Sequence, residues 1–85
     1  MRSFSHVIAD SQGLHARSCV VVSREASKWV SDVAVHDATR KADGKSMASL
    51  LALRGRKGDE LFVEVEGVDE AEAASALEAL MRMSL

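Results

Sequence analysis

A histidine followed two residues later by an arginine is the pair of side chains in this sequence best suited to phosphoryl chemistry. His15 and Arg17 come directly after Gly13-Leu14, where a glycine turn gives way to a helical pattern. Imidazole is a nucleophile that titrates near neutral pH, and guanidinium carries donors matched to phosphate oxygens. A helix start adds unpaired backbone N–H groups and the positive end of the helix dipole. This spacing predicts a histidine that carries a phosphoryl group.

The alternative interpretation of His15 is structural. A lone histidine near a helix start is more often a cap or a surface residue than a nucleophile. Whether the phosphoryl interpretation holds therefore depends on the elements that position this residue.

Length and composition narrow the possible classes of protein. A chain of 85 residues with 47% apolar residues predicts one folded domain over residues 1–85. The net charge of −2 does not support a nucleic-acid binder. The single Cys19 excludes an internal disulfide and fits a reducing compartment. The sequence contains neither a membrane-spanning run nor a signal-peptide pattern, so we expect a cytoplasmic protein without membrane insertion.

Hydrophobic periodicity predicts the order strand, helix, two strands, short helix, strand, helix. Alternation indicates strands over residues 4–9, 32–36, 40–43 and 60–66, and spacings of three and four indicate helices over 16–30, 47–54 and 70–82. Ser46 and Gly55 suit the two ends of the short helix, and Asp69 with Glu72 resembles a capping box. The pattern predicts an α+β domain with helices on one face of a four-stranded sheet. Phe62 and Glu64 are expected on its solvent face.

Three segments in this order resemble the HPr family, the histidine phosphocarriers of the bacterial phosphotransferase system. The similarity extends over residues 4–83. The segments are Gly13-Leu14-His15-Ala16-Arg17, then Gly44-Lys45-Ser46-Met47 with Leu50-Leu51-Ala52-Leu53 and Lys57-Gly58-Asp59, and finally Gly67-Val68-Asp69-Glu70-Ala71-Glu72-Ala73. The resemblance implies an open-faced β-sandwich of βαββαβα order.

The resemblance also implies a function. His15 would accept a phosphoryl group on Nδ1 from phosphoenolpyruvate through enzyme I, assisted by Arg17, and pass it to enzyme IIA domains of sugar permeases. Such a protein is a phosphoryl carrier rather than an enzyme, and it needs no cofactor. Ser46 occupies the family's regulatory phosphorylation site, which implies a serine kinase/phosphorylase and a transcription regulator as further partners. The alternative function is a regulatory binding module controlled through phospho-Ser46, with little role in transport.

The chain departs from the family pattern directly after the arginine. Ser18 replaces the usual proline, and Cys19 is larger than the usual small residue. Proline at a helix start presets φ, whereas serine restores an N–H group and adds a hydroxyl. We therefore expect the first-turn groups of Ala16 and Ser18 to cradle phosphoryl oxygens.

The short helix is expected to provide a docking surface. It carries more apolar residues than one face can bury, so some of them should be exposed near His15. The predicted partner-binding residues are Met47, Leu50, Leu51, Arg24, Lys45 and Arg54. This positive rim favours acidic partners and salt-sensitive association. A solvated face without partners is the alternative.

The sequence favours neither a thiol enzyme nor a metal site. Cys19 lies four residues after His15, but no third orienting group completes a thiol nucleophile. No histidine or cysteine spacing matches a metal site. The size and transient role of such a carrier favour a monomer.

Overall fold

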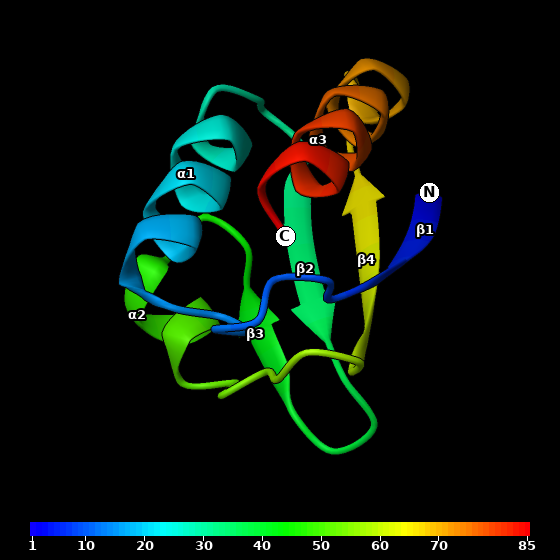
Figure 1. The fold of residues 1–85 in the computed structure, drawn as a ribbon. Helices are drawn as coiled ribbons and strands as arrows, with labels where there is room; N and C mark the ends of the chain where they lie inside the picture. The colour runs from blue at the N-terminus through cyan, green and yellow to red at the C-terminus, as the bar shows by residue number, and fades with distance from the viewer.

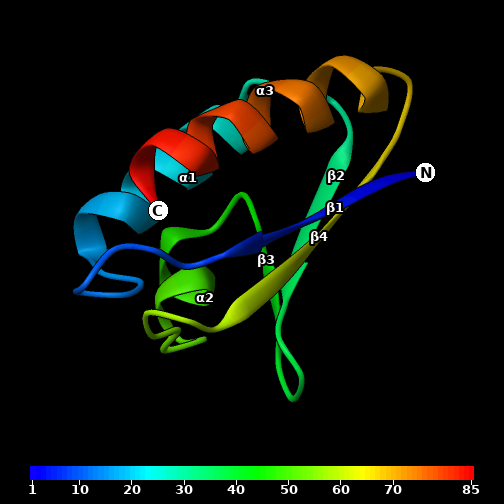
Figure 2. The same cartoon turned by 45° about the vertical axis from the view of Figure 1, so that its right-hand side comes forward.

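The sheet and helices follow the predicted order. The computed structural model describes residues 1–85. The elements are β1 (Arg2–Val7), α1 (Ala16–Ser27), β2 (Asp32–His36), β3 (Lys41–Asp43), α2 (Met47–Leu51), β4 (Glu60–Glu66) and α3 (Glu70–Ser84). Helices α1 and α3 pack side by side over one face of the sheet, while α2 packs against α1 and β3 (Figures 1 and 2). The α+β class and the βαββαβα order are confirmed.

The sheet is antiparallel, with strand order β1-β4-β2-β3. Leu61, Val63 and Val65 of β4 are buried beneath the helices, as period-two alternation requires. Phe62 points to the other face, where it stacks on His36 with ring centroids 5.4 Å apart. The exposed position of Phe62 confirms the predicted solvent face of the sheet.

Two helices end earlier than their periodicity predicted. The structure ends α1 at Ser27 rather than residue 30, and α2 at Leu51 rather than residue 54. In both cases the next backbone N–H groups bond three residues back, as in Trp29 N–H to the Ala26 carbonyl and Arg54 N–H to the Leu51 carbonyl. Such bonds tighten a last turn out of α-helical geometry.

The loop before α1 is held against the loop after α2. The Leu14 N–H donates to the Gly55 carbonyl at 2.9 Å. Gly13 has φ of +66°, and a Cβ on it would collide with that same carbonyl oxygen. Only glycine satisfies both conditions without strain. This contact fixes where the chain enters α1, and therefore where His15 lies.

The start of α3 differs from the predicted capping box. Asp69 occupies the N-cap position, but its carboxylate does not cap the helix. It accepts instead from the backbone N–H groups of Val30 and Ser31, each at 3.0 Å, and from the Ser31 hydroxyl. These bonds, that of the Ser31 hydroxyl foremost, lower the pKa of Asp69. Asp69 therefore ties the β4–α3 loop to the α1–β2 loop.

Candidate functional site

His15 is the N-cap residue of α1, and its backbone is bonded by a neighbouring serine. The Ser18 hydroxyl accepts from the His15 N–H at 3.2 Å and donates to the His15 carbonyl at 3.0 Å. The His15 ring faces the Ser18 backbone N–H, in the arrangement of a capping box, but makes no capping hydrogen bond with it. The imidazole is therefore held at the helix start with 28% of its side chain exposed.

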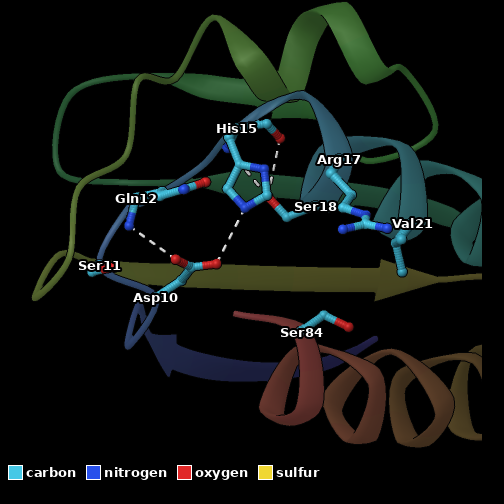
Figure 3. Close-up of a pocket in the computed structure, with 8 residues that line it drawn as sticks. All are labelled: Asp10, Ser11, Gln12, His15, Arg17, Ser18, Val21 and Ser84. Carbon is cyan, nitrogen blue, oxygen red and sulfur yellow. Dashed lines mark hydrogen bonds and ion pairs between the residues drawn. The ribbon is translucent and has the colours of Figure 1, made fainter.

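An aspartate lies on the other side of the imidazole. The Nε2 atom of His15 is 3.1 Å from Oδ2 of Asp10, and the two side chains are similarly exposed. Figure 3 shows the ring between Asp10 and the first turn of α1. Bonds from the Gln12 N–H, and secondarily from His15, hold the pKa of Asp10 below its ordinary value. The carboxylate therefore carries its negative charge at neutral pH.

Arg17 and Ala16 complete the first turn, and both are exposed. The Arg17 guanidinium extends along α1 toward Val21 and takes part in none of the ion pairs of the molecule (Figure 3). It borders a hollow whose lining is polar apart from one side chain. The residues lining it are Asp10, Ser11, Gln12, His15, Arg17, Ser18, Val21 and Ser84. In this hollow the Arg17 guanidinium, which no acidic group neutralises, lies beside the positive end of the α1 dipole. The hollow therefore suits an anion.

Ser18 corrects one expectation. Its side chain is buried, with 4% exposure, and its hydroxyl is occupied by the backbone of His15. Contrary to the prediction, the hydroxyl is therefore not directed toward phosphoryl oxygens. The Ser18 backbone N–H can still bind an anion. It lies in the first helical turn, so there is no helical carbonyl four residues before it to accept its hydrogen bond.

Cys19 is a core residue. It is 1% exposed, and burial raises the pKa of its thiol above the ordinary value. A thiol nucleophile needs a depressed pKa and access to solvent. The thiol-enzyme alternative is therefore contradicted.

A shallow apolar depression lies beside the polar hollow. Met47 and Leu51 are each more than a third exposed there, and Leu14, the residue before His15, joins the two features. The lining residues are Leu14, Met47, Ala48, Leu51, Ala52, Arg54 and Gly55. Leu50 points the other way and is 3% exposed in the core, so its assignment to the docking surface was wrong. A five-residue helix that packs on the core buries one face, and Leu50 lies on that face.

The predicted positive rim is only partly brought together. Arg54 lines the depression, with φ of 53°, and Arg24 is exposed on the last turn of α1. The Lys45 ammonium instead donates to the Trp29 carbonyl at 2.8 Å, which satisfies a carbonyl just beyond the end of α1. Lys45 therefore contributes less free positive charge to this surface than predicted.

Ser46 caps α2, as its position predicted. Its hydroxyl accepts from the Ser49 N–H at 3.2 Å, and the residue is half-buried beside Met47.

The structure contains no group of three or more histidine, cysteine, aspartate or glutamate residues placed to hold a metal ion. None of its helices has the length and apolar character needed to cross a membrane.

Sequence reasoning missed Asp10. It lies in the loop between β1 and α1. Its signal is the affinity of aspartate for turns in which its carboxylate bonds the N–H two residues on, here that of Gln12 at 2.9 Å. That turn brings the carboxylate back to a histidine five residues later.

Comparison with known proteins finds a matching family model, similar sequences and similar folds. The family model described as "PTS HPr component phosphorylation site" matches residues 2–83. The phosphocarrier protein HPr of Mycoplasma capricolum is 32% identical over 81 residues, which are 95% of this chain and 91% of that protein. HPr-C-His from Thermoanaerobacter tengcongensis superposes with a TM-score of 0.92 at 31% identity, covering 99% of this chain and 94% of that one. An HPr dimer from the same organism gives 0.77 at 31% identity, over 98% and 95%.

Fold, matched family model and relatives define a class, a small α+β carrier of phosphoryl groups. The chain belongs to the HPr family of the phosphotransferase system. It is a phosphocarrier rather than an enzyme.

Proposed function

We propose that the whole of residues 1–85 acts as one phosphocarrier domain, and that His15 accepts the phosphoryl group on Nδ1. The observation that carries this assignment is the imidazole between Asp10 and the first turn of α1, in a polar hollow that Arg17 borders. Incoming phosphoryl oxygens would meet the backbone N–H groups of Ala16, Arg17 and Ser18 and the helix dipole. The Arg17 guanidinium, which has no anionic partner in the free protein, would offset charge on the transferring group.

The proposed partners are enzyme I as donor and enzyme IIA domains as acceptors. They would dock on the apolar depression around Met47 and Leu51, which adjoins the hollow through Leu14. Arg54 and Arg24 would supply charge for acidic partners, so association should weaken as salt rises. We propose that the carrier works in the cytoplasm as a monomer, although an HPr dimer is known among its structural relatives.

Ser46 is proposed as a regulatory phosphorylation site, addressed by a serine kinase/phosphorylase. It lies next to Met47, a residue of the proposed docking surface. A phosphate there would be tolerated by the start of α2 but would repel acidic partners. Recognition of phospho-Ser46 by a transcription regulator is the role this residue would have if transport were secondary.

The test of the carrier function is labelling with enzyme I and phosphoenolpyruvate. We expect acid-labile phosphate on the wild type and none on His15→Ala, which should remain folded because the residue is partly exposed. His36→Ala is the matched control, since His36 lies on the solvent face of the sheet and should label normally. Absence of label on the wild type would favour the regulatory module, and label retained in His15→Ala would place the phosphate elsewhere.

A further inference from the structure

The carboxylate of Asp10 is a part of the site that neither the sequence pattern nor the carrier function accounts for. Its two oxygens are divided between two partners: Oδ1 accepts from the Gln12 N–H at 2.9 Å, and Oδ2 contacts His15 Nε2 at 3.1 Å. An ionised carboxylate can only accept hydrogen bonds. The Nε2 atom of His15 must therefore carry the proton in this contact.

The backbone fixes this aspartate in place. The Gly13 N–H donates to the Asp10 carbonyl at 2.9 Å and closes the turn. The N–H groups of Ala9 and Asp10 both donate to the Leu85 carbonyl at the end of α3, at 2.5 and 2.9 Å. Asp10 is thus held from both sides, and its carboxylate does not depend on His15 for its position.

We propose that Asp10 is a positioning residue for phosphoryl transfer: its carboxylate holds the proton on Nε2 of His15, so that Nδ1 presents its lone pair to the start of α1. The proposal rests on the carrier function proposed above. A neutral imidazole has one protonated and one unprotonated nitrogen, and the bond made by one decides the state of the other. Without a partner on Nε2, part of the population would carry the proton on Nδ1 and could not attack.

With the proton on Nε2, His15 can take up the phosphoryl group without gaining or losing a proton. The Nδ1 lone pair forms the new N–P bond while the bond between phosphorus and the donor's leaving atom breaks, and that electron pair leaves with the donor. The Nε2 proton stays where it is, so the ring becomes a phosphorylated imidazolium. Asp10 then faces a positive ring at hydrogen-bond distance, and its charge stabilises the cation that the attack creates.

The negative charge of Asp10 lies on the opposite side of the imidazole from the proposed anion site, which limits its repulsion of a phosphoryl group. The carboxylate contacts Nε2, whereas the phosphoryl group would be attached to Nδ1, on the side of the ring that faces the Ser18 N–H. Arg17 and the helix start lie on that second side (Figure 3). The arrangement therefore separates one acidic group from the place where a phosphoryl group would be held by donors.

The decisive variant is Asp10→Asn. The carbonyl oxygen of the introduced amide would stay on the Gln12 N–H, because the opposite orientation would set two donors against each other. The amide then offers a donor to Nε2, which favours the tautomer with the proton on Nδ1. We expect 15N NMR at pH about 8.5, where an ordinary histidine is neutral, to show His15 mainly protonated on Nε2 in the wild type and shifted several-fold toward Nδ1 in the variant.

Phosphorylation by potassium phosphoramidate, a small donor that needs no protein partner, is the second readout. We expect Asp10→Asn to be labelled about tenfold more slowly than the wild type, the scale of one hydrogen bond to a charged group. Asp37→Asn is the matched control, because Asp37 also closes a turn with backbone N–H groups but its carboxylate contacts no histidine. Asp10→Glu restores the charge on a longer side chain and should recover part of the rate.

The experiments distinguish failure of the positioning role from failure of the carrier function. An unchanged tautomer ratio in Asp10→Asn, or a rate loss equal to that of Asp37→Asn, would overturn the positioning role. A carboxylate that only braced the loop would leave Asp10→Asn equal to the wild type in both measurements. Failure of the wild type to accept phosphate from enzyme I would contradict only the proposed carrier function. The tautomer measurement would still test the contact between Asp10 and His15, because it requires no phosphoryl transfer.

Discussion

The N-termini of α1 and α2 differ in which side chain makes the capping hydrogen bonds. Both cap residues, His15 and Ser46, have extended backbone conformations. At α2 the cap side chain does the capping, since the Ser46 hydroxyl accepts from the Ser49 N–H. At α1 the hydroxyl of Ser18 bonds the cap residue's backbone instead. A reactive side chain can therefore stand at a helix start when a residue three positions on makes the backbone bonds.

The surroundings of the two starts differ in the same sense. The first turn of α1 borders a polar hollow with Arg17 and Asp10, whereas that of α2 borders an apolar depression with Met47 and Leu51. The proposed phosphoryl site and the proposed docking surface thus lie at neighbouring helix starts, and Leu14 lies between them. The following substitutions test this division.

Arg17→Ala should produce the largest change at the α1 start. Loss of a charge-stabilising contact in a transition state costs roughly 2–4 kcal/mol, which corresponds to a transfer rate slower by about 30-fold to about 900-fold. Rapid-quench kinetics of transfer to and from His15 measures it. Arg17→Lys should recover only part of the rate, because an ammonium lacks the planar fork. Arg82→Ala, which replaces an exposed arginine on α3 outside the proposed docking surface, is the control, and equal losses in both variants would remove the special role of Arg17.

Ser46→Asp should act at the α2 start through charge. We expect several-fold slower phosphorylation of His15 by enzyme I at low salt, with the defect shrinking as salt rises, because like charges then repel less. Ser46→Asn keeps a capping side chain without the charge and should behave as the wild type. Equal rates for Ser46→Asp and Ser46→Asn at low salt would remove Ser46 from regulation.

Ser18→Pro should shorten the life of the phosphoprotein by a factor of a few. Proline removes the backbone N–H from the first turn, a loss on the scale of one hydrogen bond of about 0.5–1.5 kcal/mol. The hydrolysis half-lives of the phosphorylated proteins at one pH decide it. Ser18→Ala keeps the N–H and loses only the hydroxyl, so its half-life should stay near that of the wild type. Proline and alanine variants with the same half-life would show that the N–H is not used.

The smallest expected difference is in stability. Ser46→Ala removes a side-chain cap and should lower the free energy of unfolding by about 1 kcal/mol. His15→Ala should cost less, because Ser18 rather than the imidazole bonds the backbone at that start. Urea unfolding of both variants at pH 7 compares them directly. A larger loss in His15→Ala would mean that the imidazole is a structural cap after all.

Local pattern explains which features were predictable from sequence. The alternation of Leu61, Val63 and Val65 and the spacing of α1 predicted strand and helix correctly, because each element buries one face of its own sequence. Leu50 was misplaced because its neighbours Met47 and Leu51 are equally apolar, and only packing decides which side of a short helix is covered.

The missed parts of the site depend on how separate segments meet. Asp10 contacts His15 only because a turn closes between them, and its position depends on the Leu85 carbonyl, which comes from the far end of the chain. Lys45 bonds the Trp29 carbonyl rather than the docking surface, and the segments it joins lie sixteen residues apart. Contacts of this kind leave no periodic signal in the sequence.

The bonds from Ala9 and Asp10 to the Leu85 carbonyl have a dynamic consequence. Helix ends open more readily than helix centres, and local opening exposes the amides that depend on them to exchange with solvent. The amides of Ala9 and Asp10 should therefore exchange hydrogen for deuterium in step with the last turn of α3, and faster than those of central β4. Each opening of that turn would loosen the support of Asp10, so the fraying rate of a helix terminus would set an upper limit on how long the imidazole keeps its orientation.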